Sequence, residues 1–132
     1  MHLSQISMIA AVALSFSAAA DEPKTAPEPQ RVILERHDQS AATGKEIVIG
    51  TATLPPGSSI GYHTHPGDEI GYVVKGTLIR KAKGEPDRTL RAGESFFNPR
   101  GIVHSVAAGS DGATVVSTWV IDKGQPLATP VP

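Results

Sequence analysis

Apolar residues occur in short runs between residues 31 and 122, and glycine or proline interrupts them every few positions. Many of these runs are rich in β-branched residues, which is typical of strands. After residue 20, no stretch of ten or more residues shows helical periodicity. The pattern predicts strands at residues 31–36, 46–54, 60–65, 69–75, 77–83, 89–91, 95–98, 103–107 and 113–122. Short strands at this spacing, with turns at Gly76 and at residues 109–112, indicate an all-β sandwich or barrel.

Length and composition favour one globular domain. The chain has 132 residues, of which 39% are hydrophobic and 19% charged, and a chain of this length commonly forms a single core. Its net charge of −1 gives no reason to expect nucleic acid or an anionic membrane as a partner. Because the chain has no cysteine, disulfides, thiolate metal ligands and cysteine nucleophiles are excluded.

The N-terminus has the pattern of a secretory signal peptide. Residues 8–20 form an apolar run that ends in three alanines before a polar segment. The run is too short for a membrane-spanning helix, although residues 1–7 lack the usual lysine or arginine. We expect a signal peptide at residues 1–20, a proline-rich linker at residues 21–30 and the folded domain at residues 31–132, in a periplasmic or secreted protein. The alternative is an N-terminus without a targeting role.

Two histidines and a carboxylate lie within seven positions of one another in the middle of the chain. His63 and His65 are two residues apart, so on an extended strand their side chains point to the same face. Pro66 and Gly67 then distort the chain, and Glu69 follows. Two neutral imidazoles and a carboxylate on one surface make a ligand set for a first-row transition metal. A fourth ligand has to come from elsewhere.

The spacing around these residues resembles the first motif of the cupin superfamily. That motif reads Gly, five residues, His-x-His, three or four residues, Glu, six residues, Gly. The chain matches it at Gly57, His63, His65, Glu69 and Gly76.

The second cupin motif is matched further along the chain. It reads Gly, five residues, Pro-x-Gly, two residues, His, three residues, Asn, and the chain fits it at Gly93, Pro99, Gly101 and His104. Its last position differs, because Ala108 replaces the asparagine, which is not a metal ligand in the family.

The resemblance implies a double-stranded β-helix, or jelly-roll β-barrel, with a metal in its mouth. The ligands it implies are His63, His65, Glu69 and His104. The chain looks most like small single-domain bacterial cupins that are similar to quercetin dioxygenase. The remaining histidine of the predicted domain, His37, is expected to be structural or solvated.

The ligand set suits several divalent transition metals, namely Fe, Mn, Ni, Cu and Zn, and does not choose among them. With four protein ligands, an octahedral ion keeps two positions for water, substrate or O₂. Glu69 is also the candidate catalytic residue, as a possible proton acceptor. Cupins that process oxalate generally carry an arginine or asparagine shortly before the first histidine, whereas Ile60 and Gly61 stand there in this chain.

Strand alternation predicts which other side chains face the interior. One of Phe96 and Phe97 must point inward. One of Arg80 and Lys81 does the same and is a candidate for holding an anionic substrate, the alternative being two solvated surface cations. Trp119 is either a core residue or a wall of the pocket.

Two functions from different classes remain open. The first is an exported metal-dependent oxygenase that acts on a small organic molecule. The second is a non-catalytic module that binds a metal or a small ligand, and the lack of a second catalytic group supports it. By resemblance a homodimer is expected, in which the strand at residues 31–36 adds to a neighbour's sheet.

Overall fold

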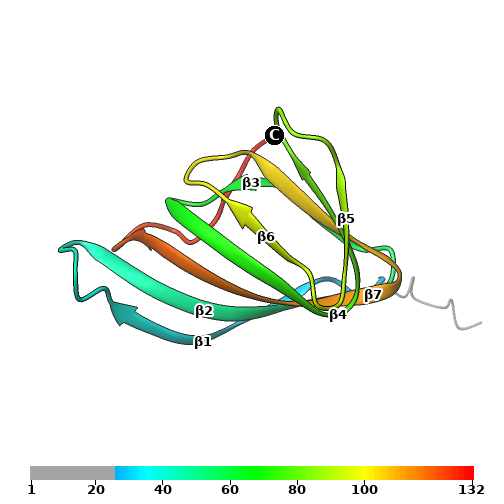
Figure 1. The fold of residues 1–132 in the computed structure, drawn as a ribbon, viewed down its shortest axis with the longest axis horizontal. Helices are drawn as coiled ribbons and strands as arrows, with labels where there is room; N and C mark the ends of the chain where they lie inside the picture. Colours follow the sequence, from blue (N-terminus) through cyan, green and yellow to red (C-terminus); the bar gives the residue numbers. More distant parts are fainter. Residues whose placement is uncertain (1–25) are drawn as a thin grey trace, which may run out of the picture.

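The computed structural model describes residues 26–132, so the predicted signal peptide and residues 21–25 of the predicted linker lie outside it. The described residues form strands and turns (Figure 1). No helix among them has the length and apolarity needed to cross a membrane. The strands are β1 (Gln30–Asp38), β2 (Lys45–Leu54), β3 (Ser59–Thr64), β4 (Gly67–Ala82), β5 (Arg88–Arg91), β6 (Ser95–Asn98), β7 (His104–Asp122) and β8 (Thr129–Pro130). The predicted all-β, single-domain fold is confirmed.

Two of these strands are longer than the sequence pattern predicts. β4 continues through Gly76, and β7 continues through residues 109–112, so the strand ends expected there are wrong. Both strands stay paired with each other on either side of Gly76, with register shifts near it. Gly76 has a φ of 77°, and a Cβ on it would lie 2.1 Å from the carbonyl oxygen of Gly112. These glycines therefore bend the strands without ending them.

The bend divides the antiparallel strands into two layers. One layer has the order β1, β2, the second half of β7, the first half of β4, and β6. The other contains β8, β3, the first half of β7, the second half of β4, and β5. Figure 1 shows β4 and β7 curving from one layer into the other. Because these two strands belong to both layers, they connect the core to the candidate site.

The interior holds two hydrophobic clusters. The larger consists of Leu54, Val73, Leu78, Leu90, Phe96, Ala108, Ala113 and Val115. The smaller consists of Val48, Trp119 and Ile121. Phe96 is buried and its neighbour Phe97 is exposed, which confirms that one of the two points inward.

Candidate metal centre

Strand pairing brings the three predicted histidines together in the interior. His63 on β3 is the direct register partner of His104 on β7, and His65 follows immediately after β3. All three are buried, and one potential ligand atom from each lies within 4.8 Å of the others. The prediction that His63 and His65 share a face is confirmed. His37 on β1 is exposed and bonded to Glu35, so it lies outside the cluster, as expected.

Backbone carbonyls orient all three imidazole rings. The Nδ1 atom of His63 lies 2.7 Å from the carbonyl oxygen of Gly61. That of His65 lies 2.6 Å from the carbonyl oxygen of Leu127, and that of His104 lies 3.0 Å from the carbonyl oxygen of Ile102. A carbonyl only accepts hydrogen bonds, so each Nδ1 carries the proton and donates it. In the neutral imidazole the lone pair then lies on Nε2, the atom that remains free to bind a metal.

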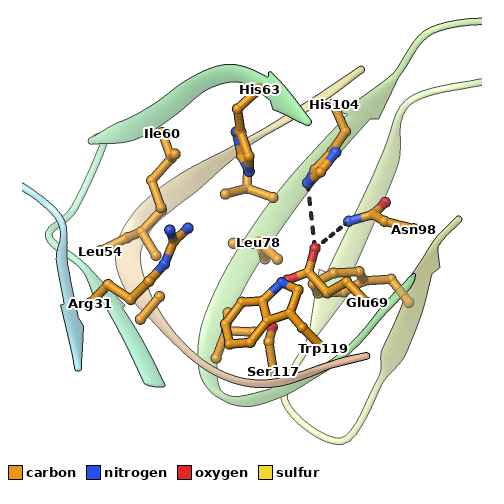
Figure 2. Close-up of a pocket in the computed structure, with 14 residues that line it drawn as sticks. Arg31, Leu54, Ile60, His63, Glu69, Leu78, Asn98, His104, Ser117 and Trp119 are labelled. Carbon is orange, nitrogen blue, oxygen red and sulfur yellow. Dashed lines mark hydrogen bonds and ion pairs between the residues drawn. The ribbon is translucent and has the colours of Figure 1, made fainter. Parts of the chain in front are cut away.

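Glu69 on β4, the fourth predicted ligand, is not part of this three-histidine cluster but contacts two of its members. Its Oε2 lies 3.1 Å from His65 Nε2. The same oxygen lies 3.4 Å from His104 Nε2 (Figure 2). The same oxygen accepts a 2.8 Å hydrogen bond from Asn98 Nδ2. Burial on its own would raise the pKa of Glu69, but the contacts with His104, His65 and Asn98 outweigh it and hold that pKa well below its usual range. Glu69 is therefore a carboxylate at neutral pH.

This arrangement fits a bound cation. With the Nδ1 proton donated to Leu127, His65 Nε2 faces the Glu69 carboxylate, and within residues 26–132 this Nε2 has no hydrogen-bond partner. Two buried acceptors this close require a positive charge between them, either a proton or a metal ion. The pKa of His63 is lowered to about 4, mainly by burial and also by the nearby His104, His65 and Arg31. The hydrogen bond to the Gly61 carbonyl acts in the opposite direction. His63 is thus neutral at pH 7 and can act as a metal ligand.

A buried polar chain behind Glu69 was not predicted from the sequence. Arg80, the inward residue of the pair Arg80 and Lys81, donates from Nε to Asn98 Oδ1 at 2.7 Å. It also bonds Glu85 at 2.6 Å and the carbonyl of Phe97 at 3.1 Å. Its guanidinium is therefore directed at Asn98, which in turn holds Glu69, and it does not line the cavity. Asn98 is two residues after the inward Phe96, so alternation along β6 predicts that it points inward but not that it contacts Glu69.

A small cavity of about 30 Å³ borders the cluster, which is room for only a few heavy atoms. Apolar side chains form most of its wall, among them Leu54, Ile60 and Leu78 (Figure 2). Its polar lining comes from Arg31, His63, Glu69, Asn98, His104, Ser117 and Trp119.

Ser117, which lines the cavity, lies in a row of small residues. Ser117 on β7 pairs with Gly50 on β2 and with Gly71 on β4, so a row of small residues crosses the sheet. A Cβ on Gly71 would lie 2.0 Å from the ring of Phe96. A Cβ on Gly50 would lie 3.4 Å from the ring of Trp119 and 2.7 Å from a backbone oxygen. Gly71 therefore lets the Phe96 ring lie directly against the sheet, and Gly50 lets β1 approach β2 closely.

The comparisons with known proteins agree with this geometry. A family model described as a cupin domain matches residues 50–121. An oxalate-binding protein of Thermotoga maritima is 35% identical over 69 residues, covering 52% of this chain and 56% of that protein. Oxalate oxidase 2 of Hordeum vulgare is 32% identical over 107 residues, covering 64% of this chain and 48% of that protein. The chain thus spans about half the length of these relatives.

Solved structures show the same fold. KdgF from Halomonas sp. superposes with a TM-score of 0.59 at 26% identity, covering 76% of this chain and 84% of that one. The matched family segment covers more than half of the sequence and includes His63, His65, Glu69 and His104. The chain is therefore a member of the cupin superfamily.

Proposed function

We propose that this cupin holds a divalent transition metal through His63, His65, His104 and Glu69 and uses it to act on a small organic molecule, as an oxygenase. The observation that supports the metal most directly is the pair of buried acceptors, His65 Nε2 and Glu69 Oε2, 3.1 Å apart. The bonds at Nδ1 leave the Nε2 atoms as the ligand atoms of all three histidines. Fe, Mn, Ni, Cu and Zn all suit this donor set.

The chain's own groups would have distinct roles around the metal. Three backbone carbonyls fix the imidazole rings, and Asn98 fixes the Glu69 carboxylate. The apolar walls limit access of bulk water, which strengthens electrostatic interactions inside. When bound, the metal would supply Lewis acidity and open positions for substrate and O₂. The low pKa of Glu69 favours a role as ligand over a role as proton acceptor.

A non-catalytic binding module is the second candidate. Among residues 26–132, the cavity wall contains no titratable groups other than His63, Glu69, His104 and Arg31. If the first three hold the metal, no separate general base remains in the wall. The similarity to an oxalate-binding protein supports the same alternative. For both candidates we propose export to the periplasm or beyond, on the basis of the N-terminal sequence pattern.

Metal analysis of the full chain, purified from its own host, tests the metal site. We expect a stoichiometric transition metal in the wild type and its loss in His104→Ala, because a buried ligand is removed. His37→Ala is the matched control, because that histidine is exposed and outside the cluster. A wild-type protein that neither retains nor takes up any of the five metals would contradict the proposal.

Oxygen uptake then separates the two candidates. The protein is loaded in turn with Fe, Mn, Ni and Cu and offered a panel of small phenols, thiols, diketones and carboxylic acids. An oxygenase consumes O₂ with at least one pair of metal and substrate, and His104→Ala abolishes the uptake. Metal retention without any O₂ uptake or product would favour the binding module.

A further inference from the structure

An arginine from the edge strand reaches the cavity from outside the cupin motifs. Arg31 lies on β1, where its register partner is Ala52 of β2, another residue of the cavity wall. Figure 2 shows its guanidinium directed from β1 toward the cavity. The guanidinium carbon lies 5.7 Å from the centroid of the Trp119 ring. Arg31 is exposed on this edge strand, and none of the ion pairs within residues 26–132 involves it.

Trp119 adds a second donor that has no acceptor. Its side chain is 2% exposed, and its Nε1 has no hydrogen-bond partner within the described residues. The centroid of its ring lies 5.7 Å from that of the His65 ring, and the guanidinium of Arg31 lies over the indole. Figure 2 shows the indole nitrogen on the side of the ring that faces Glu69. A buried N–H group normally has a partner, so one is expected from a bound molecule.

The chemistry of the cavity wall therefore selects for negative charge. A guanidinium and an indole N–H line one side, and buried Ser117 adds a hydroxyl from the same face of β7. Carboxylate oxygens accept hydrogen bonds from all three groups, and a guanidinium can bind a carboxylate through two parallel bonds. Arg31 is exposed, so solvent screens part of its charge, whereas Trp119 and Ser117 are buried. The small cavity favours a small ligand.

We propose that Arg31 and Trp119 make this cavity selective for small organic acids, with a carboxylate of the ligand held by these two donors beside the metal. The inference rests on the proposed metal site and specifies the class of molecule that the site accepts. The sequence has no arginine or asparagine shortly before the first histidine. In this proposal Arg31 of β1, more than thirty positions upstream of His63, binds the carboxylate instead.

Calorimetric titration of the full chain tests this, after loading with Zn²⁺, which has no redox chemistry to consume the ligand. The probes are oxalate and its neutral analogue oxamide. We expect oxalate to bind and oxamide to bind at least 10-fold more weakly. Arg31→Gln should weaken oxalate binding by about 10- to 100-fold, because a charge-assisted hydrogen bond is lost. The affinity of Arg31→Lys for oxalate should lie between those of the wild type and Arg31→Gln, because lysine keeps the charge but cannot form two parallel hydrogen bonds.

Further variants separate the donor groups from general effects. Trp119→Phe removes the N–H together with one of the two fused rings, and should weaken oxalate binding several-fold. Arg91→Gln is the matched control for net charge, because this exposed arginine on β5 is outside the cavity. Competition with a chelator should give the same Zn²⁺ affinity for wild type, Arg31→Gln and Arg91→Gln.

The outcomes distinguish this inference from the proposed function. If the Zn²⁺-loaded wild type binds oxalate and Arg31→Gln binds it equally well, the role of Arg31 is overturned. If the protein holds Zn²⁺ but binds none of oxalate, glycolate, malonate and acetate, the organic-acid proposal is overturned and the metal site stands. A chain that binds no Zn²⁺ or other metal overturns both.

Discussion

At the scale of single residues, the most unusual feature is a buried arginine that points away from the cavity. The side chain of Arg80 is 1% exposed, and its charge is balanced by Glu85, whose carboxylate is partly solvated. The hydrogen bond from Arg80 lowers the pKa of Glu85, so this carboxylate remains charged. A guanidinium so deeply buried is costly unless its donors are satisfied. Here the donors bond Glu85, the Phe97 carbonyl and Asn98. Asn98 in turn donates a hydrogen bond to Glu69 and so helps to fix its carboxylate.

Arg80→Met should therefore weaken metal binding although Arg80 contacts no proposed ligand atom. Without the guanidinium, Asn98 can rotate and Glu69 loses its fixed donor, and losses of this kind cost about 10- to 100-fold in metal affinity. Lys81→Met is the matched control, because this neighbour points outward and pairs with Asp87 on the surface. Chelator competition for Zn²⁺ measures both variants. Asn98→Leu provides a second test of similar side-chain volume, and unchanged Zn²⁺ affinity in a folded variant would contradict the role of the chain.

At the scale of elements, the fold depends on two long strands that bend together. β4 and β7 pair along most of their length, with Gly76 opposite Ala113 at the bend. On one side of the bend β4 presents Glu69, and on the other side Ala82 pairs with His104. The relative position of Glu69 and His104 is therefore determined by the geometry of the bend. A change at Gly76 should affect both the stability of the fold and the metal site.

Substituting two glycines of the same backbone conformation tests this dependence. Gly76 and Gly84 have φ values of 77° and 80°, so alanine is strained at both. Gly84→Ala meets no atom within 4 Å and should cost about 1 to 2 kcal/mol of unfolding free energy from strain alone. Gly76→Ala adds a clash with the Gly112 backbone and should cost about 3 kcal/mol or more. Urea unfolding followed by tryptophan fluorescence measures both, and equal losses would show that the close approach does not matter.

At the scale of the whole molecule, local sequence patterns predicted the histidine cluster, and contacts between distant strands determined its surroundings. His63 and His65 follow from alternation within one strand, and His104 from its place in a motif. The position of Asn98 beside Glu69 depends on the pairing of β6 with β4, which joins residues 29 positions apart. Arg31 reaches the cavity only because β1 pairs with β2. Such long-range pairings cannot be derived from local periodicity, which is why the polar surroundings of the site were missed.

The outer surface also carries features that a monomer would leave exposed. Within residues 26–132, β1 is an edge strand whose one partner is β2, and all of its residues are exposed, including Val32 and Leu34 at 53% and 55%. Further exposed apolar side chains lie on the neighbouring strands of the same layer, namely Ile47, Ile70, Tyr72, Val74, Phe97 and Val120. An exposed apolar edge invites pairing with another chain.

A homodimer is therefore expected, in which β1 contacts a second copy of the chain. Light scattering coupled to size-exclusion chromatography should give twice the chain mass of 13.8 kDa, less any segment removed on export. The double substitution Val32→Lys and Leu34→Lys should shift the protein to monomer, because it places charges on the edge strand. Thr89→Lys, on the exposed side of β5, is the control and should leave the mass unchanged. A wild-type monomer at micromolar concentration would contradict the prediction.

If only the double variant were monomeric, oxalate titration of that variant would show whether Arg31, beside Val32, needs the partner chain to keep its position.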